Sequence, residues 1–276
     1  LSRDDDSSSI HFNLALALER QKNLPAALEE YRRAIELDPT ITVAHLNRGA
    51  ILSRSNDPSQ LESGIVALRE AVRLNPNLAA SHYHLGLALE RSGQFPDAFK
   101  HYRQASLLAP DHLGNAMQLA HLLERAGKLE SALTEYQKIY DIHPQSAQAA
   151  FQIGAVFEKL SRPGEAAVAY RNSLRQQKNY VPALNNLAWM LATTRDKDLR
   201  DPSEALKLAE LAARETRFES AAILDTLATA QFAAGDKAAA IATLKKAIPL
   251  AAAADQTAFS AELAKKLSNY QGPPAR

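Results

Sequence analysis

The sequence predicts an all-α protein, an α-solenoid of about seven helix-turn-helix repeats followed by one C-terminal capping helix. Three observations carry this prediction. Alanine and leucine dominate the composition and only 10 glycines interrupt 276 residues, which favours helix over sheet. Residues 11–39 (HFNLALALERQKNLPAALEEYRRAIELDP) are closely echoed by residues 82–110 (HYHLGLALERSGQFPDAFKHYRQASLLAP). The same pattern returns roughly every 34 residues, so one structural element is repeated along the chain.

The repeats can be placed one after another along the chain. Residues 1–7 are polar and acidic and are predicted to form a flexible tail. The repeats then follow near residues 8–41, 42–78, 79–112, 113–146, 147–180, 181–220 and 221–254. Residues 255–271 are amphipathic and predict a helix that shields the apolar face of the last repeat. Residues 272–276 are predicted to form a second short tail.

Each repeat carries a motif of small and large residues at fixed positions. In the third repeat, Gly86 and Ala98 are small enough for two helices to approach closely, whereas Leu85 and Tyr102 fill the space around that contact. Pro110 cannot donate a helical hydrogen bond and ends the second helix. This motif resembles the tetratricopeptide repeat over residues 8–254. The resemblance implies a right-handed solenoid whose first helices line a concave groove, and a scaffold that binds other proteins.

Composition and charge exclude several classes of function. Lys and Arg total 32 against 31 for Asp and Glu, so the chain lacks the basic excess that nucleic-acid binding requires. No apolar run approaches the roughly 20 residues of a membrane helix, so no membrane insertion is expected. The absence of cysteine rules out disulfides and Zn–Cys sites. A soluble protein is expected, and the compartment stays open between cytoplasm and periplasm.

The sequence carries no signature of catalysis, and we expect no enzyme, no catalytic residue and no cofactor. It contains no phosphate-binding glycine loop, no HExxH and no GxSxG. His11, His45 and His82 occupy the position of the motif that packs between helices. We therefore expect structural histidines and no metal site, since no second ligand recurs at a chelating distance.

The candidate binding residues lie on the first helix of each repeat, on the face opposite the packed one. The sixth position carries amides or an imidazole in nearly every repeat: Asn13, Asn47, His84, Gln118, Gln152 and Asn186. Such groups donate and accept together, which suits the backbone of an extended peptide; a merely solvated polar face is the alternative. The fifth position carries large apolar side chains: Phe12, Leu46, Tyr83, Met117 and Phe151. Trp189 either faces the groove or packs against a neighbouring first helix.

The partner class follows from these positions. Repeat proteins that clamp a C-terminal carboxylate need cations where this chain has Ser9, Ala80 and His84, so a carboxylate clamp is not expected. The row of amides resembles that in the repeat domain of O-linked N-acetylglucosamine transferase, which holds extended polypeptides. We therefore expect a protein or peptide partner. A self-assembly or spacer module of a larger bacterial protein is the alternative, because residues 183–196 and 224–236 resemble repeat regions of bacterial multidomain proteins.

Overall fold

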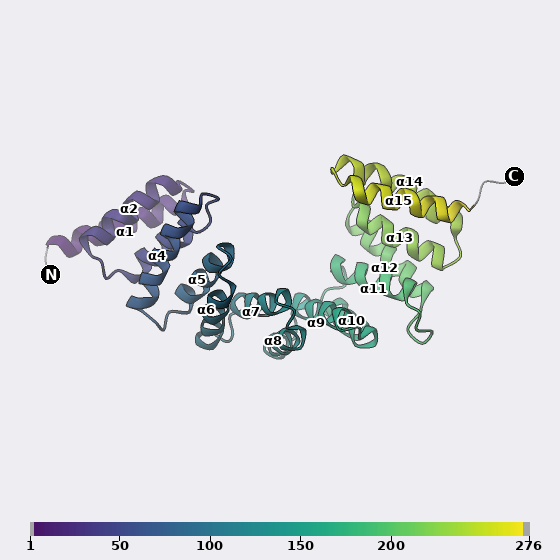
Figure 1. Ribbon diagram of the computed structural model, residues 1–276, viewed down its shortest axis with the longest axis horizontal. Coiled ribbons are helices and arrows are strands. Elements are labelled where there is room, and N and C mark those ends of the chain that lie inside the picture. Colours follow the sequence, from purple (N-terminus) through teal and green to yellow (C-terminus); the bar gives the residue numbers. More distant parts are fainter. Residues whose placement is uncertain (1–2, 273–276) are drawn as a thin grey trace. The chain divides into compact units, whose positions relative to one another are not determined.

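The computed structural model describes residues 3–272, over which the chain forms 15 helices and no strand (Figure 1). Consecutive helices pack against each other as antiparallel pairs, so the predicted all-α fold of repeated helix pairs is confirmed. Contacts divide the chain into two compact units, Leu1–Glu135 and Tyr136–Arg276, here called the N-terminal and C-terminal units. None of the described helices is long and apolar enough to span a membrane.

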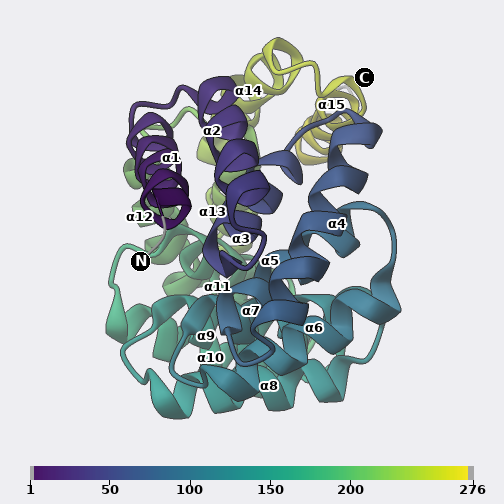
Figure 2. The same ribbon diagram turned by 90° about the vertical axis from the view of Figure 1, so that its left-hand side faces the viewer.

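The N-terminal unit consists of helix pairs that follow the predicted repeats (Figure 2). Its helices are α1 (Arg3–Arg20), α2 (Leu24–Leu37), α3 (Thr42–Leu52), α4 (Pro58–Leu74), α5 (Ala79–Arg91), α6 (Phe95–Leu108) and α7 (Leu113–Arg125). The boundary between the two units falls within α8 (Leu129–Ile142). From α1 to α14, odd-numbered helices are thus the first helices of repeats, and even-numbered helices are the second.

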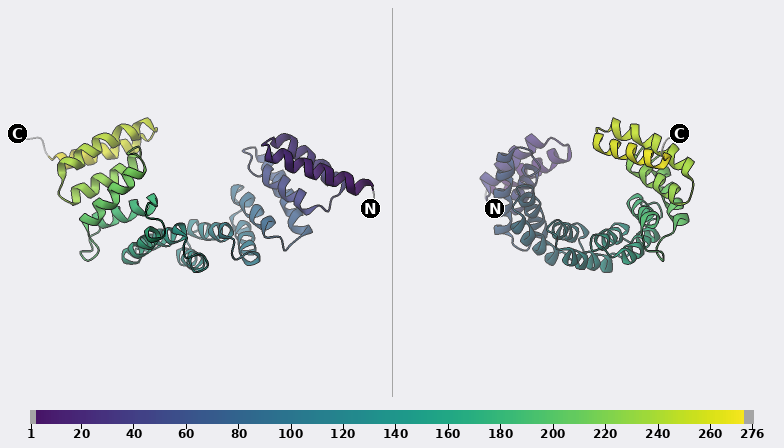
Figure 3. Two further views of the ribbon diagram at one scale, coloured as in Figure 1. Left: turned by 180° about the vertical axis from the view of Figure 1, so that it is seen from behind. Right: turned by 45° about the vertical axis from the view of Figure 1, so that its right-hand side comes forward.

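The C-terminal unit continues the same alternation. Its helices are α9 (Ala147–Lys159), α10 (Pro163–Gln176), α11 (Val181–Thr193), α12 (Pro202–Glu215), α13 (Ala221–Ala233), α14 (Lys237–Ala253) and α15 (Thr257–Gln271). The last three pack in succession and form the yellow-green end of the chain in Figure 3. Helix α15 therefore lies where the sequence predicts a capping helix.

The N-terminal tail that we predicted is largely helical instead. Helix α1 begins at Arg3, so residues 3–7 belong to it. The segment contains no proline or glycine that would stop a helix before His11, which explains the longer helix. Residues 273–276, most of the predicted C-terminal tail, lie outside the described residues.

Short polar residues begin several helices and glycines end them. Asp57 and Asp201 cap α4 and α12, and each is followed by a proline at the first helical position. The turn after α5 contains Gly93 with φ of 80°. In the corresponding turn after α1 a lysine, Lys22, adopts φ of 61°, a left-handed conformation that costs energy for any residue with a Cβ.

In the first, third and fifth repeats the core forms where a small residue on the first helix meets a tyrosine on the second. Tyr31, Tyr102 and Tyr170 are completely buried. A Cβ added to Gly86 would lie 2.7 Å from Cδ1 of Tyr102, and one added to Gly154 would lie 2.6 Å from Cδ1 of Tyr170. The close helix contact predicted from the motif is therefore confirmed.

Candidate functional site

The first helices of the N-terminal unit carry four of the predicted polar residues. Asn13 is exposed on α1, whereas Asn47, His84 and Gln118 are half-buried on α3, α5 and α7. Among the described residues, Asn13, His84 and Gln118 have no hydrogen-bond partner. Burial, and then the charge of Arg54, lowers the pKa of His84, which keeps its imidazole neutral. A neutral imidazole has one donor and one acceptor to offer, as the two amides do.

Asn47 differs, because it already binds another part of the chain. Its Nδ2 donates to the hydroxyl of Tyr31 on the preceding second helix at 3.0 Å. The same hydroxyl donates to Oε2 of Glu19 at 2.7 Å. Burial raises the pKa of Tyr31 well above its usual value, so the hydroxyl keeps the proton that it donates. One tyrosine oxygen thus connects three successive helices, α1, α2 and α3.

The C-terminal unit repeats this arrangement around Tyr170. The hydroxyl of Tyr170 donates to Glu158, and Nδ2 of Asn186 donates to the hydroxyl at 3.2 Å. Burial also raises the pKa of Tyr170. We call each such group of glutamate, tyrosine and asparagine a carboxylate–tyrosine–amide chain. Asn47 and Asn186 therefore join neighbouring repeats.

The sequence contains a signal for these chains that our interpretation of the sequence missed. Glutamate and tyrosine are 12 residues apart, and tyrosine and asparagine are 16 apart. The same spacing connects Glu90, Tyr102 and Gln118, where Tyr102 donates to Glu90 at 2.8 Å. Gln118 forms no bond to Tyr102 in the described structure, so its amide is available. The sixth-position amides therefore fall into two groups: Asn47 and Asn186 bond to a tyrosine hydroxyl, whereas Gln118 has no hydrogen-bond partner among the described residues.

The fifth-position side chains also divide into two groups. Phe12, Tyr83 and Phe151 are half-buried, with their ring centroids 6.0, 6.2 and 5.6 Å from those of the core tyrosines of their repeats. Leu46 and Met117 are only 7% and 5% exposed, so they belong to the core. Phe12 and Tyr83 thus keep exposed aromatic surface in the N-terminal unit, and Phe151 does so in the C-terminal unit.

Trp189 lies on α11 in the C-terminal unit and is 38% exposed. The ammonium of Lys266, on α15, lies 4.8 Å from the centre of its ring. Lys266 also pairs with Asp225 on α13 at 2.5 Å. Helix α15 therefore contacts both α11 and α13 through Lys266. Trp189 is partly exposed to solvent and also contacts α15. Gln152 is half-buried on α9 of the same unit.

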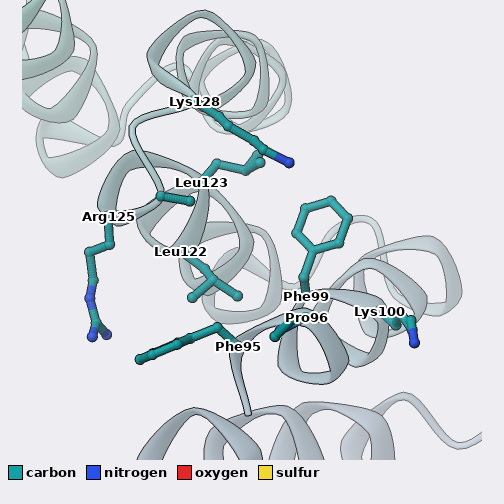
Figure 4. Close-up of a pocket in the computed structure, with 9 residues that line it drawn as sticks. Phe95, Pro96, Phe99, Lys100, Leu122, Leu123, Arg125 and Lys128 are labelled. Carbon is teal, nitrogen blue, oxygen red and sulfur yellow. The ribbon is translucent and has the colours of Figure 1, made fainter. Parts of the chain in front are cut away.

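An apolar pocket of about 700 Å³, which we did not predict from the sequence, lies between α6 and α7 (Figure 4). Phe95, Phe99, Leu122 and Leu123 form its walls. The guanidinium of Arg125 lies 5.2 Å from the centre of the Phe95 ring. Phe95 is nevertheless 43% exposed, so the pocket is open enough to receive an apolar side chain.

The histidines of the packing position have structural roles, as predicted. Nε2 of His45 lies 2.9 Å from the carbonyl of Pro39, and Nε2 of His82 lies 2.9 Å from that of Pro76. Each histidine thus binds the end of the preceding repeat. In the part of the chain that the structure describes, no group of three or more His, Cys, Asp or Glu could hold a metal ion.

The chain matches family models of the tetratricopeptide repeat over residues 8–41, 79–112 and 117–182. Similar solved structures include the MamA protein, with 20% identity and a TM-score of 0.57 over 63% of this chain and 93% of that one. YrrB, described as a tetratricopeptide protein with an unusual peptide-binding site, has 21% identity and a TM-score of 0.55 over 64% of this chain and 89% of that one.

A tetratricopeptide repeat protein from Parabacteroides merdae is similar over most of both molecules. The match covers 95% of this chain and 99% of that one, with 15% identity and a TM-score of 0.61. A search of curated proteins found no match. At these identities the structures show the fold, and the family models add the repeat motif itself. The chain is a tetratricopeptide-repeat protein.

Proposed function

We propose that this protein, a protein–protein interaction scaffold, binds an extended polypeptide segment along its first helices and catalyses no reaction. The observation that carries the proposal is the set of free hydrogen-bonding groups in the N-terminal unit. Asn13, His84 and Gln118 occupy the same position of three repeats, and none has a partner among the described residues. Each can donate and accept, as an extended backbone requires.

The surroundings of these groups favour a ligand. His84 and Gln118 are half-buried, and a half-buried polar group without a partner gains more from a new hydrogen bond than an exposed one. The ring of Tyr83 lies 5.3 Å from that of His84, which places an aromatic surface beside a polar one. Backbone contacts would supply affinity, and contacts to Phe12 and Tyr83 would select side chains. The peptide-binding site described for YrrB supports peptide recognition by this fold.

The remaining predicted residues take different parts in the proposal. Asn47 and Asn186 hold neighbouring repeats together and are expected to affect stability more than binding. Phe151 and Trp189 keep exposed surface in the C-terminal unit and are candidates for side-chain contacts there.

Peptide display followed by titration of selected peptides tests this proposal. The variant N13A/H84A/Q118A should weaken binding at least about tenfold, since each net hydrogen bond contributes roughly 0.5–1.5 kcal/mol. Its melting temperature should change little, because these side chains form no hydrogen bond with any described residue. A matched control replaces Gln104, Gln137 and Gln176, three amides on second helices, by alanine and should bind as the wild type does.

Equal binding by both triple variants would contradict a role for the first helices. In that case the self-assembly or spacer function becomes the better explanation, and sedimentation of the chain alone would measure it.

A further inference from the structure

One residue breaks the repeat pattern at a packed position. The seventh position of the first helix is leucine or isoleucine in six of the seven repeats: Leu14, Leu85, Leu119, Ile153, Leu187 and Leu227. Five of these side chains are at most 8% exposed. The second repeat carries Arg48 instead. A positive charge at a core position costs stability unless something compensates it, so its presence calls for a physical reason.

The structure offers Arg48 no such compensation within the chain. Its side chain is half-buried on α3 and makes neither a hydrogen bond nor an ion pair with any described residue. Burial, and then the positive charge of Arg32, lowers the pKa of Arg48. Arg32 itself pairs with Glu29 and Glu36 on α2. The Arg48 guanidinium is therefore partly desolvated, repelled by a neighbour and unpaired.

Arg48 lines a pocket of about 680 Å³ whose lining residues come from α2, α3 and α4. Four arginines and two glutamates line it: Arg32, Arg48, Arg69, Arg73, Glu36 and Glu70. Arg32 and Arg73 pair with the two glutamates, which leaves Arg48 and Arg69 uncommitted, that is, without an ion pair to any described residue. The pKa of Asp97 on α6 is lowered mainly by its hydrogen bond from Lys100, and the charge of Arg69 contributes least to that shift. The pocket thus has a surplus of two positive charges. Its remaining lining consists of His45 and of the apolar residues Ile35, Ala67 and the 58% exposed Val66.

We propose that this pocket binds a phosphate monoester, with Arg48 and Arg69 on the phosphate and Ile35 and Val66 against the organic group. A phosphate monoester carries about −1.5 to −2 charges near neutral pH, which matches the two uncommitted guanidiniums, whereas a carboxylate would neutralise only one. The planar guanidinium forms paired hydrogen bonds with phosphate oxygens. The pocket is lined by residues of α2, α3 and α4, and none of them is among the peptide-binding residues proposed above.

Calorimetric titration of the full chain with phenyl phosphate tests the proposal, with the variant Arg48→Leu restoring the residue of the other repeats. We expect Arg48→Leu to weaken phenyl phosphate binding at least about tenfold, the value of a lost hydrogen bond between charged groups. The same variant should raise the melting temperature, because it removes an unpaired half-buried charge. The control Arg54→Gln removes one positive charge from the turn that follows the same helix and should bind phenyl phosphate as the wild type does.

Inorganic phosphate and benzoate are the comparison ligands. Binding of phenyl phosphate more tightly than either supports a site for both the dianion and the apolar group. Equal affinity for benzoate would overturn the assignment to phosphate, and equal affinity for inorganic phosphate would overturn the role of Ile35 and Val66. The proposal fails if millimolar phenyl phosphate does not bind, if Arg48→Leu binds it unchanged, or if Arg48→Leu melts at a lower temperature.

Discussion

Replacing Gly86 by alanine should destabilise the third repeat by an amount that follows from one contact. The added Cβ would lie 2.7 Å from Cδ1 and 2.8 Å from Cε1 of Tyr102, about 1 Å inside the usual carbon–carbon separation of roughly 3.5–4.0 Å. Tyr102 is fully buried and its hydroxyl is held by Glu90 at 2.8 Å, so the ring cannot move away freely. Overpacking of this size costs about 3 kcal/mol.

The gain in helix propensity offsets part of that cost. Alanine is about 1 kcal/mol more favourable than glycine within a helix, which leaves a net loss of about 2 kcal/mol. Thermal unfolding followed by circular dichroism should show a melting temperature roughly 4–8 °C lower. Gly164→Ala is the matched control, because a Cβ at Gly164 on α10 would meet no atom within 4 Å. Equal melting temperatures for the two variants would refute the assignment of Gly86 to a tight contact.

Three further changes have expected outcomes. Lys22→Gly should raise the free energy of unfolding by about 1 kcal/mol, because it relieves a left-handed conformation, whereas Lys22→Ala should give no gain; urea titration measures both. Asn47→Ala should lower that free energy by about 0.5–1.5 kcal/mol, the value of its hydrogen bond, while Asn13→Ala should leave it unchanged in the same titration. Burial, and then the charge of His82, lowers the pKa of His101 from 6.5 to about 4, so the unfolded chain binds an additional proton between these values. Stability should therefore fall as pH drops from about 6.5 to about 4, and His101→Gln should flatten that slope in melting experiments at a series of pH values.

The sequence was sufficient for features that depend on residue size and spacing. Gly86 and Tyr102 recur at fixed positions, and their contact follows from the need of two helices to pack closely. The structural role of His45 followed in the same way, because its position is a packing position in every repeat. Helix ends were predicted where a proline marks them. The start of α1 was not predicted, because no residue near it excludes either a helix or a flexible tail.

The hydrogen-bond partner and the exposure of an individual side chain could not be predicted in the same way. Asn47 and Gln118 both lie 16 residues after a buried tyrosine, yet among the described residues only Asn47 of these two bonds to the tyrosine hydroxyl. Likewise Leu46 and Tyr83 share a position, but leucine is short enough to be covered and tyrosine keeps an exposed edge. The repeat periodicity predicts on which face of a helix a residue lies. Its hydrogen-bond partner depends on which side chains the neighbouring repeat places within reach.

The carboxylate–tyrosine–amide chain gives the assembly of repeats a direction. The hydroxyl of Tyr31 is already paired with Glu19 inside its own helix pair, so this pair satisfies its buried oxygen without the next one. Asn47, by contrast, finds its acceptor only when the preceding pair is folded. A nascent chain that emerges from its N-terminus would fold each pair onto a template that is already complete. When a repeat is added at the C-terminal side, its asparagine forms a new hydrogen bond to the tyrosine of the preceding repeat. That preceding repeat does not need this bond in order to fold.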